Sequence, residues 1–458
     1  MNKALQGKKL LILGAIRMVK TIIEEAKKMG IYTCVTDYLE NSPAKKYADE
    51  SFMVSVTDVD SLVDLCKRER FDGVTIQYIE SMLPYYFDLC KQMDYPVYGT
   101  KEQFILTSNK KSFKEICKKN KVPTIKEYKK GEKVDFPIFV KPVDNSGARG
   151  MTICYSNEEL SLAIRKAEEF SKAKDVLIEK YMDDSCACVN IDYLVVDGEF
   201  HLVGVGDKYV LREKENTAPI TAAVSYPSIY LDEYVRDLDE KVKTMYSSLG
   251  IKNGYIFIES FHDEDGFHFY EMGYRIGGGQ YYLFLDKLFG VNVMQMFINH
   301  ALTGKMINKQ LPNTLTPYLP KQCCSVVLLL SKGVIGNIFG LEKISDCVNI
   351  INFTQLLAVG DEIKDSDVGT LKQALCRLHI IAEDREDLKN IITNVFNTIQ
   401  VLDVDARHIK KVKITKFNKR KKQEKARGQV GKDGTVHTHC IGAFTRNVLY
   451  CQRNWQSK

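Results

Sequence analysis

The chain has 458 residues, of which 45% are hydrophobic and 27% are charged, the composition of an ordinary globular protein. The length predicts two to four domains or subdomains, and the longest apolar runs, such as Cys323–Leu330, are far below the roughly 18–20 residues that cross a bilayer. The formal net charge of +6 arises in positions 410–458, which carry +12, so the first 409 residues carry −6 and the basic balance does not indicate nucleic-acid binding by the body of the chain.

The N-terminal segment MNKALQGKK runs directly into the apolar stretch LLILG, which is too short for the apolar region of a signal peptide. The 13 cysteines are scattered, with no CxxC pair and no histidine at zinc-site spacing, which favours reduced thiols. We therefore expect a cytoplasmic protein with no membrane attachment.

Strand and helix patterns alternate through the first hundred residues. KLLILG ends at Gly14, a helical segment follows to Gly30, and IYTCVTD is a β-branched strand that ends at Asp37. Such alternation predicts a parallel, doubly wound, Rossmann-like sheet over residues 1–105. The single Gly14 is not a GxGxxG fingerprint, so the pattern favours a scaffold that supports a later site over a dinucleotide site.

The pattern changes after Gly99. A basic helix over Ser108–Asn120 stops before Pro123, and long strands over 187–210 and 254–275 suggest mixed α+β structure. We predict one domain over 106–310, with a smaller subdomain at about 112–182, and a segment over 311–409 that closes it. Residues 410–458 are basic and aperiodic and are expected to be disordered; a solvated extension is favoured over a nucleic-acid or membrane arm.

The strongest local signal is a pair of glutamates, Glu259 and Glu271, on either side of the turn HDEDGF. If the hairpin is centred on Asp265, the two residues lie opposite each other, on a face that also carries Phe257, Phe261 and Phe269. Two carboxylates so close repel unless a proton or a cation lies between them, and Mg²⁺ bridging phosphate oxygens would remove the conflict. The alternative is an exposed glutamate pair at a sheet edge.

The loop DNSGARG over 144–150 lies between two predicted strands. Gly147 and Gly150 permit close backbone approach, so successive N–H groups can surround phosphate oxygens, and Arg149 adds positive charge. The loop has no GK[ST] and is not a Walker loop. An ordinary glycine-rich hairpin is the alternative.

Three lysines and one strand add weaker signals. Lys141 ends the apolar strand FPIFVKP, Lys110 lies in the first turn of a helix, and Lys208 follows another apolar strand, so each could face an anion. The strand VLIEKYM (Val176–Met182) could line an adenine site. The alternatives are surface lysines and an ordinary core strand.

The order and spacing of these features resemble the ATP-grasp superfamily, most closely its carboxylate–amine ligase branch, which is similar to biotin carboxylase and the large chain of carbamoyl-phosphate synthase. The resemblance covers roughly residues 8 to 405. It implies a Rossmann-like pre-ATP-grasp domain over 1–105 followed by an ATP-grasp fold whose 112–182 subdomain is a mobile lid. It also implies binding of ATP and Mg²⁺, with Mn²⁺ as an alternative metal.

The resemblance assigns expected roles to residues. Those expected to contact ATP are Lys110, Lys141, Gly147, Arg149, Gly150, Glu179, Lys180 and Met182. Glu259 and Glu271 are expected to bind the metal, and Arg275 and Lys208 to be catalytic, Arg275 by steadying the acyl phosphate. Two positions depart from the family: Gly273 replaces a usual asparagine ligand, and Cys186 replaces a usual ribose-binding glutamate.

The resemblance predicts an ADP-forming ligase that activates a carboxylate as an acyl phosphate and couples it to an amine or a thiol. The alternatives are a carboxylase or carbamoyl-phosphate-synthase-like enzyme, a non-catalytic nucleotide-binding module suggested by Gly273 and Cys186, and a nucleic-acid-associated protein that uses the basic tail. We expect small-molecule acid and amine partners, no nucleic acid, and a homodimer. Arg212 and Arg275 favour an anionic substrate.

Overall fold

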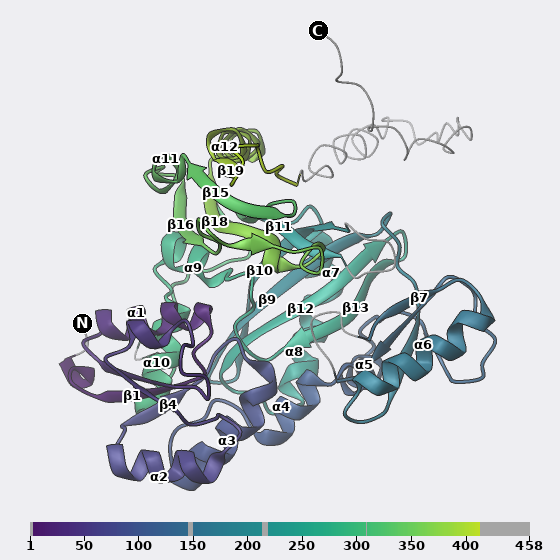
Figure 1. Cartoon of the computed structure of the whole chain (residues 1–458). Coiled ribbons are helices and arrows are strands. Elements are labelled where there is room, and N and C mark those ends of the chain that lie inside the picture. Colours follow the sequence, from purple (N-terminus) through teal and green to yellow (C-terminus); the bar gives the residue numbers. More distant parts are fainter. Residues whose placement is uncertain (1–2, 145–149, 213–218, 308, 413–458) are drawn as a thin grey trace. The chain divides into compact units, whose positions relative to one another are not determined.

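The computed structural model describes residues 3–144, 150–212, 219–307 and 309–412 (Figure 1). Within these residues the strands form sheets of four, eight, four and three strands. The predicted fold class, α/β followed by α+β, is confirmed. None of the described helices is long and apolar enough to cross a membrane.

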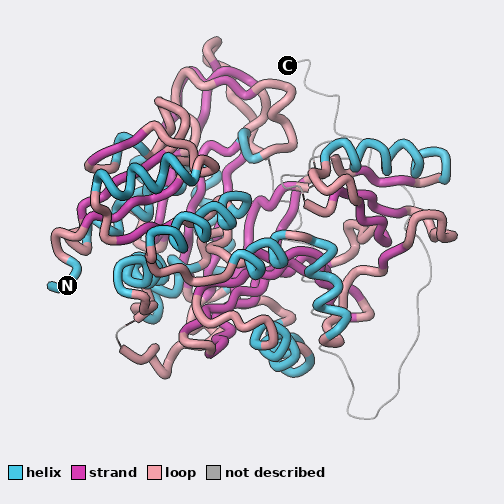
Figure 2. The backbone as a smooth tube through the Cα atoms, turned by 90° about the horizontal axis from the view of Figure 1, so that it is seen from below, coloured by secondary structure: helices cyan, strands magenta, loops and turns pink. Residues whose placement is uncertain are grey.

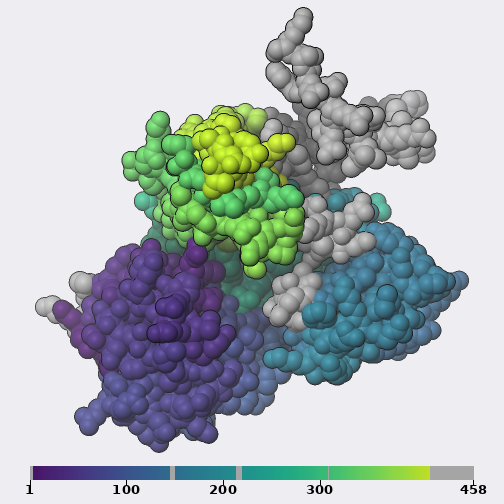
Figure 3. Space-filling view, viewed as in Figure 1, coloured from purple at the N-terminus to yellow at the C-terminus, as the bar shows by residue number. Residues whose placement is uncertain are grey.

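The N-terminal sheet is parallel, in the order β3-β2-β1-β4, as the alternating pattern predicts. Its strands are β1 (Lys9–Leu13), β2 (Tyr32–Thr36), β3 (Glu50–Phe52) and β4 (Gly73–Thr75). Helices α1 (Lys20–Lys28), α2 (Val59–Glu69) and α3 (Leu83–Met93) connect and cover the strands. In the space-filling view these residues form one contiguous body (Figure 3).

The eight-stranded sheet, called the large sheet below, has the order β13-β12-β9-β10-β11-β14-β18-β16, and all its pairs are antiparallel. Its strands lie side by side in the tube view (Figure 2). They are β9 (Ala187–Val196), β10 (Glu199–Leu211), β11 (Ile220–Tyr226), β12 (Gly254–Asp263), β13 (Gly266–Gly273), β14 (Gln322–Leu329), β16 (Ile350–Gln355) and β18 (Ala374–Ala382). Strands from positions beyond 311 therefore extend the same sheet as β9–β13.

A second four-stranded sheet, called the middle sheet, has the order β5-β8-β6-β7. It comprises β5 (Glu127–Tyr128), β6 (Ile138–Pro142), β7 (Thr152–Cys154) and β8 (Val176–Lys180). Helix α6 (Asn157–Phe170) packs against it, and its own small core includes Ile138, Val140 and Ile178. The predicted basic helix is α5 (Lys110–Lys119), which Asn109 caps by accepting from the backbone N–H groups of Lys111 and Ser112.

The remaining described α-helices and strands are α4 (Lys101–Ser108), α7 (Leu231–Asp237), α8 (Asp239–Ser247), α9 (Tyr282–Phe289), α10 (Val293–Thr303), α11 (Leu341–Ser345), α12 (Arg385–Thr398), β15 (Gly333–Phe339), β17 (Glu362–Ile363) and β19 (Gln400–Asp403). Leu238, whose φ of −128° leaves helical geometry, separates α7 from α8.

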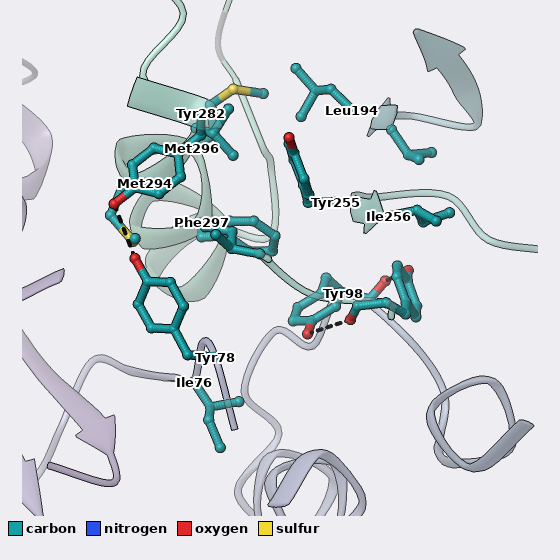
Figure 4. Packing of buried hydrophobic residues seen from close by; sticks show 14 of the residues in the cluster. Ile76, Tyr78, Tyr98, Leu194, Tyr255, Ile256, Tyr282, Met294, Met296 and Phe297 are labelled. Atoms are coloured by element: carbon teal, nitrogen blue, oxygen red, sulfur yellow. Dashed lines mark hydrogen bonds between the residues drawn. The ribbon is translucent and has the colours of Figure 1, made fainter. Parts of the chain in front are cut away.

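Buried tyrosines join the N-terminal residues to the rest of the core (Figure 4). The Tyr98 hydroxyl donates to the carbonyl of Tyr274 at 3.2 Å, and the Tyr274 hydroxyl donates to the carbonyl of Tyr98 at 2.9 Å. The hydroxyls of Tyr78 and Tyr282 lie 3.0 Å apart. These paired polar groups satisfy buried donors while the rings fill space.

Residues 410–412, which were expected to belong to a disordered tail, pair with the body of the chain. The backbone N–H of Ser331 donates to the carbonyl of Lys410 at 2.8 Å, and that of Val412 donates to the carbonyl of Leu329 at 2.9 Å. The apolar Val412 side chain packs against a small core cluster, which explains why the ordered chain continues past the first basic residues. Residues 413–458 lie outside the described residues.

Candidate active site

The hairpin of β12 and β13 places Glu259 directly opposite Glu271, as predicted. The hairpin is not centred on Asp265 as expected: the tight turn pairs Asp263 with Gly266. A bulge beside Ser260 then shifts the pairing by one residue, and this shift brings Glu259 opposite Glu271. Gly266 has the expected positive φ, +98°. The hairpin therefore brings two carboxylates together next to the bulge, on the side away from the turn.

The bulge also reverses one expected side chain. Phe269 does not share the glutamate face: it is fully buried and stacks near Tyr234 of α7, with ring centroids 6.4 Å apart. Tyr270 takes the place next to Phe261, with ring centroids 4.8 Å apart. Strict alternation along β13 fails there because the bulge inserts an extra residue.

Each glutamate of the pair has a lysine partner. Lys208 Nζ lies 2.7 Å from Glu259 Oε1, and Lys110 Nζ lies 3.5 Å from Glu271 Oε1. Burial opposes ionisation of Glu259, but the Lys208 ammonium and the Tyr270 hydroxyl outweigh it and hold the pKa of this carboxyl below its ordinary value. Both predicted lysines are buried at this site, which makes the surface-lysine alternative wrong for them.

Glu179 on β8 is buried between two lysines. Lys141 Nζ of β6 lies 2.7 Å from Glu179 Oε2, and Lys114 Nζ of α5 contacts Glu179 Oε1. Burial opposes ionisation, yet the two ammonium groups hold the pKa of Glu179 below its ordinary value. Lys114 was missed by sequence reasoning; its spacing of four from Lys110 on one helix face was the available signal.

The rest of the expected nucleotide segment lies at the end of β8. The backbone N–H of Lys180 donates to the carbonyl of Lys126 at 2.9 Å, and the Met182 side chain is buried. Nearby, Arg212 lies 3.7 Å from Asp184 and 5.8 Å from the Tyr181 ring. The adenine roles of Glu179, Lys180 and Met182 stay predictions.

The expected phosphate loop is described only at its two ends, Asp144 and Gly150. Gly147 and Arg149 lie outside the described residues. Gly150 has φ +77° and is buried; a Cβ there would lie 2.6 Å from the Cβ of Phe170 on α6. A larger residue at position 150 would therefore strain both the backbone and the packing of the loop's base.

Arg275 follows β13 and meets a residue from the N-terminal segment. Its Nε lies 3.5 Å from Glu80 Oε1, and its guanidinium lies 4.9 Å from the ring centroid of Phe257. Burial raises the pKa of Glu80, and Arg275 opposes that rise. Sequence reasoning missed Glu80, because nothing local in YIES connects it with a position 195 residues later.

Position 273, where the ATP-grasp family usually has an asparagine, has no room for a side chain. A Cβ there would lie 2.3 Å from the Phe257 ring and 3.0 Å from Glu80 Oε1. The Phe257 ring, which also supports Arg275, occupies the space beside this backbone position. The loss of an oxygen ligand at position 273 is thus built into the packing of the site.

We expect Gly273→Ala to lower the free energy of unfolding by about 1–3 kcal/mol, because the Phe257 ring must move from its place under Arg275. Denaturant unfolding followed by fluorescence would measure the change. Gly278→Ala is the matched control, since a Cβ at Gly278 meets no atom within 4 Å. Equal stability of the two variants would show that position 273 is not crowded.

The donor set fits a hard divalent cation held jointly with phosphate oxygens. Among the described residues, no three histidine, cysteine, aspartate or glutamate side chains lie close enough to hold a metal by themselves. Glu259 and Glu271 supply two facing carboxylates, and such oxygen ligands suit Mg²⁺ when substrate phosphates complete its coordination.

Comparison with known proteins agrees with this geometry. Residues 107–274 match the family described as D-ala D-ala ligase C-terminus. The chain contains an ATP-grasp domain. The predicted superfamily is therefore confirmed.

The chain is also similar to curated proteins and to solved structures. The formate-dependent phosphoribosylglycinamide formyltransferase of Methanocaldococcus jannaschii is 24% identical to this chain over 219 residues. The alignment covers 42% of this chain and 56% of that protein. The chain thus spans about half the length of the curated relatives it matches.

Two solved structures share the fold over most of the chain. An L-amino acid ligase from Bacillus licheniformis has a TM-score of 0.69 at 19% identity and covers 87% of this chain and 99% of that one. The biotin carboxylase domain of Hydrogenobacter thermophilus 2-oxoglutarate carboxylase, solved as a dimer with MgADP and bicarbonate, has a TM-score of 0.71 at 18% identity, covering 92% and 95%.

Proposed function

We propose that the chain is a Mg-ATP-dependent, ADP-forming ligase that phosphorylates a carboxylate and couples the resulting acyl phosphate to an amine. The observation that carries the proposal is the facing pair Glu259 and Glu271, each balanced by a buried lysine, within the matched ATP-grasp segment. At such a site the lysine ammonium groups would contact the oxygens of a triphosphate, and the glutamate carboxylates would bind the cation that accompanies it.

The proposed reaction has two steps. An oxygen of the carboxylate attacks the γ-phosphorus of ATP, the bond to the β-phosphate oxygen breaks, and ADP leaves. The amine nitrogen then attacks the carbonyl carbon, inorganic phosphate departs, and the nitrogen loses a proton. The first step converts an unreactive carboxylate into a mixed anhydride with a good leaving group.

The chain's residues serve this chemistry by position and charge. Lys110, Lys141 and Lys208 would neutralise phosphate oxygens, and Arg275 would steady the acyl phosphate beside Glu80. Gly147, Arg149 and Gly150 would close over the phosphates and keep water from the anhydride. Mg²⁺, when bound, supplies charge neutralisation at the phosphates, and Mn²⁺ is the alternative metal.

The proposed organisation follows the expected boundaries, with a pre-ATP-grasp domain over 1–105, an ATP-grasp domain over 106–310 that includes a mobile lid at 112–182, and a closing segment to 409. Pairing of β11 with β14 supports one continuous sheet across residue 310. The dimeric biotin carboxylase domain with the same fold supports a homodimer.

ADP release in the presence of Mg²⁺, screened over pools of carboxylic acids and amines, tests the proposal. We expect ADP only when ATP, an acid and Mg²⁺ are all present. Hydroxylamine in place of the amine should capture the acyl phosphate as a hydroxamate. ADP formation that requires only bicarbonate and biotin would favour a carboxylase, and nucleotide binding without turnover in any pool would contradict the ligase.

A further inference from the structure

Tyr270 is turned into the glutamate face by the bulge in the β12–β13 hairpin. The residue before it, Phe269, is fully buried against α7, and the residue after it, Glu271, pairs with Glu259. Regular alternation would have placed Tyr270 on the opposite side from Glu271. The bulge therefore gives two consecutive residues of β13 access to the same site.

The hydroxyl of Tyr270 completes the restraint of Glu259. It donates to Glu259 Oε2 at 2.7 Å, while Lys208 Nζ lies 2.7 Å from Glu259 Oε1. Lys208 also donates to the Tyr270 hydroxyl oxygen at 3.4 Å. Because different donors hold the two carboxylate oxygens, the plane of the carboxylate is set, and each oxygen retains a lone pair for a cation.

The ring of Tyr270 lies between the two parts of the site. It packs on Phe261, and Lys141 Nζ lies 5.8 Å from its centroid. Lys141 is the lysine that pairs with Glu179 at 2.7 Å. One side chain thus contacts both the lysine of the middle sheet and the metal-site glutamate of the large sheet.

We propose that Tyr270 is the positioning residue for Glu259, and that its hydroxyl orients this carboxylate to bind the divalent cation that accompanies ATP. The inference rests on the proposed function. A donor that fixes the orientation of a metal ligand commonly accounts for about 10- to 100-fold in metal affinity. Removing only the hydroxyl should leave the ring packing intact and free the Glu259 carboxylate to rotate.

The test uses the full chain with Tyr270→Phe. Manganese binding is measured by electron paramagnetic resonance at a saturating concentration of a non-hydrolysable ATP analogue, and analogue binding is measured separately without metal. We expect the dissociation constant for Mn²⁺ to rise by about tenfold or more. Metal-free analogue binding should change by less than about twofold, because Tyr270 acts on the cation through Glu259.

Tyr226→Phe is the matched control. Its hydroxyl is also buried on the large sheet and donates to a carboxylate, Asp192 Oδ2, at 3.2 Å. This variant removes the same atom from the same kind of bond without touching Glu259. Its Mn²⁺ dissociation constant should stay within about twofold of the wild-type value, which separates positioning of Glu259 from a general loosening of the sheet.

Three results would overturn the inference. Equal Mn²⁺ affinity in Tyr270→Phe and the wild type would show that Glu259 needs no such positioning, and would leave the ligase proposal standing. An equal loss in Tyr226→Phe would assign the effect to the sheet as a whole. If the wild type itself binds neither the analogue nor Mn²⁺, the proposed function fails along with the inference.

Discussion

Glu271→Gln is expected to lower the rate of ADP formation by about 10²- to 10³-fold while leaving the fold intact. The amide keeps the shape of the side chain but loses the charge that a hard cation needs, and it leaves Lys110 without its carboxylate at 3.5 Å. The Glu271 side chain is 30% exposed but the Lys110 side chain only 5%, so loss of this partly buried ion pair should lower the free energy of unfolding by about 1–3 kcal/mol.

Steady-state ADP release and thermal unfolding would measure both parts of this result. Glu50→Gln is a suitable control, because it removes a carboxylate that pairs with Lys9 at 3.3 Å in the N-terminal sheet. The control should keep its turnover. Near-normal turnover in Glu271→Gln would show that the facing glutamates are not the metal site.

Glu179→Ala is expected to cost about 3–5 kcal/mol of stability, because it leaves two ammonium groups in a buried place with no counter-charge. Glu179 and Lys114 are fully buried, and the Lys141 side chain is only 4% exposed. Burial lowers the pKa of Lys114 already in the presence of Glu179. Hydrogen exchange of the β6 and β8 amides would show the loss where it arises.

The double variant Glu179→Leu with Lys114→Met separates charge from packing. It removes one ammonium together with the carboxylate but leaves Lys141 without a counter-charge, so only part of the lost stability should return. If Glu179→Ala lowered the free energy of unfolding by less than about 1 kcal/mol, the two lysine side chains would have to reach solvent in the variant. Nucleotide affinity, measured in parallel, tests the expected role of Glu179 near the base.

Acid should reproduce part of this effect. The lysines hold the pKa of Glu179 below its ordinary value, so its contribution is fully present above the usual carboxylate range. That contribution is lost as the pH falls through the lowered pKa. Glu179→Ala should lack this acid-dependent component of unfolding.

Local patterns in the sequence predict much of the site. The turn residues Asp265 and Gly266 and the flanking alternation indicate the β12–β13 hairpin, and the apolar strand before Lys141 indicates β6. Such signals succeed because hairpin register and strand burial depend on residues close together in the chain. The same signals led to one error, Phe269, because a bulge has no clear sequence mark.

The amino-acid sequence by itself determined the strand–helix alternation, the facing of Glu259 and Glu271, and the order of the lysines on which the resemblance to the ATP-grasp superfamily rests. Only the tertiary structure decided that Glu80 meets Arg275, that Lys114 shares Glu179 with Lys141, and that Phe257 fills the space at Gly273. The physical reason is the distance along the chain over which a signal acts. Periodicity indicates on which face of a helix or strand a residue lies, whereas these contacts depend on how separate elements pack together.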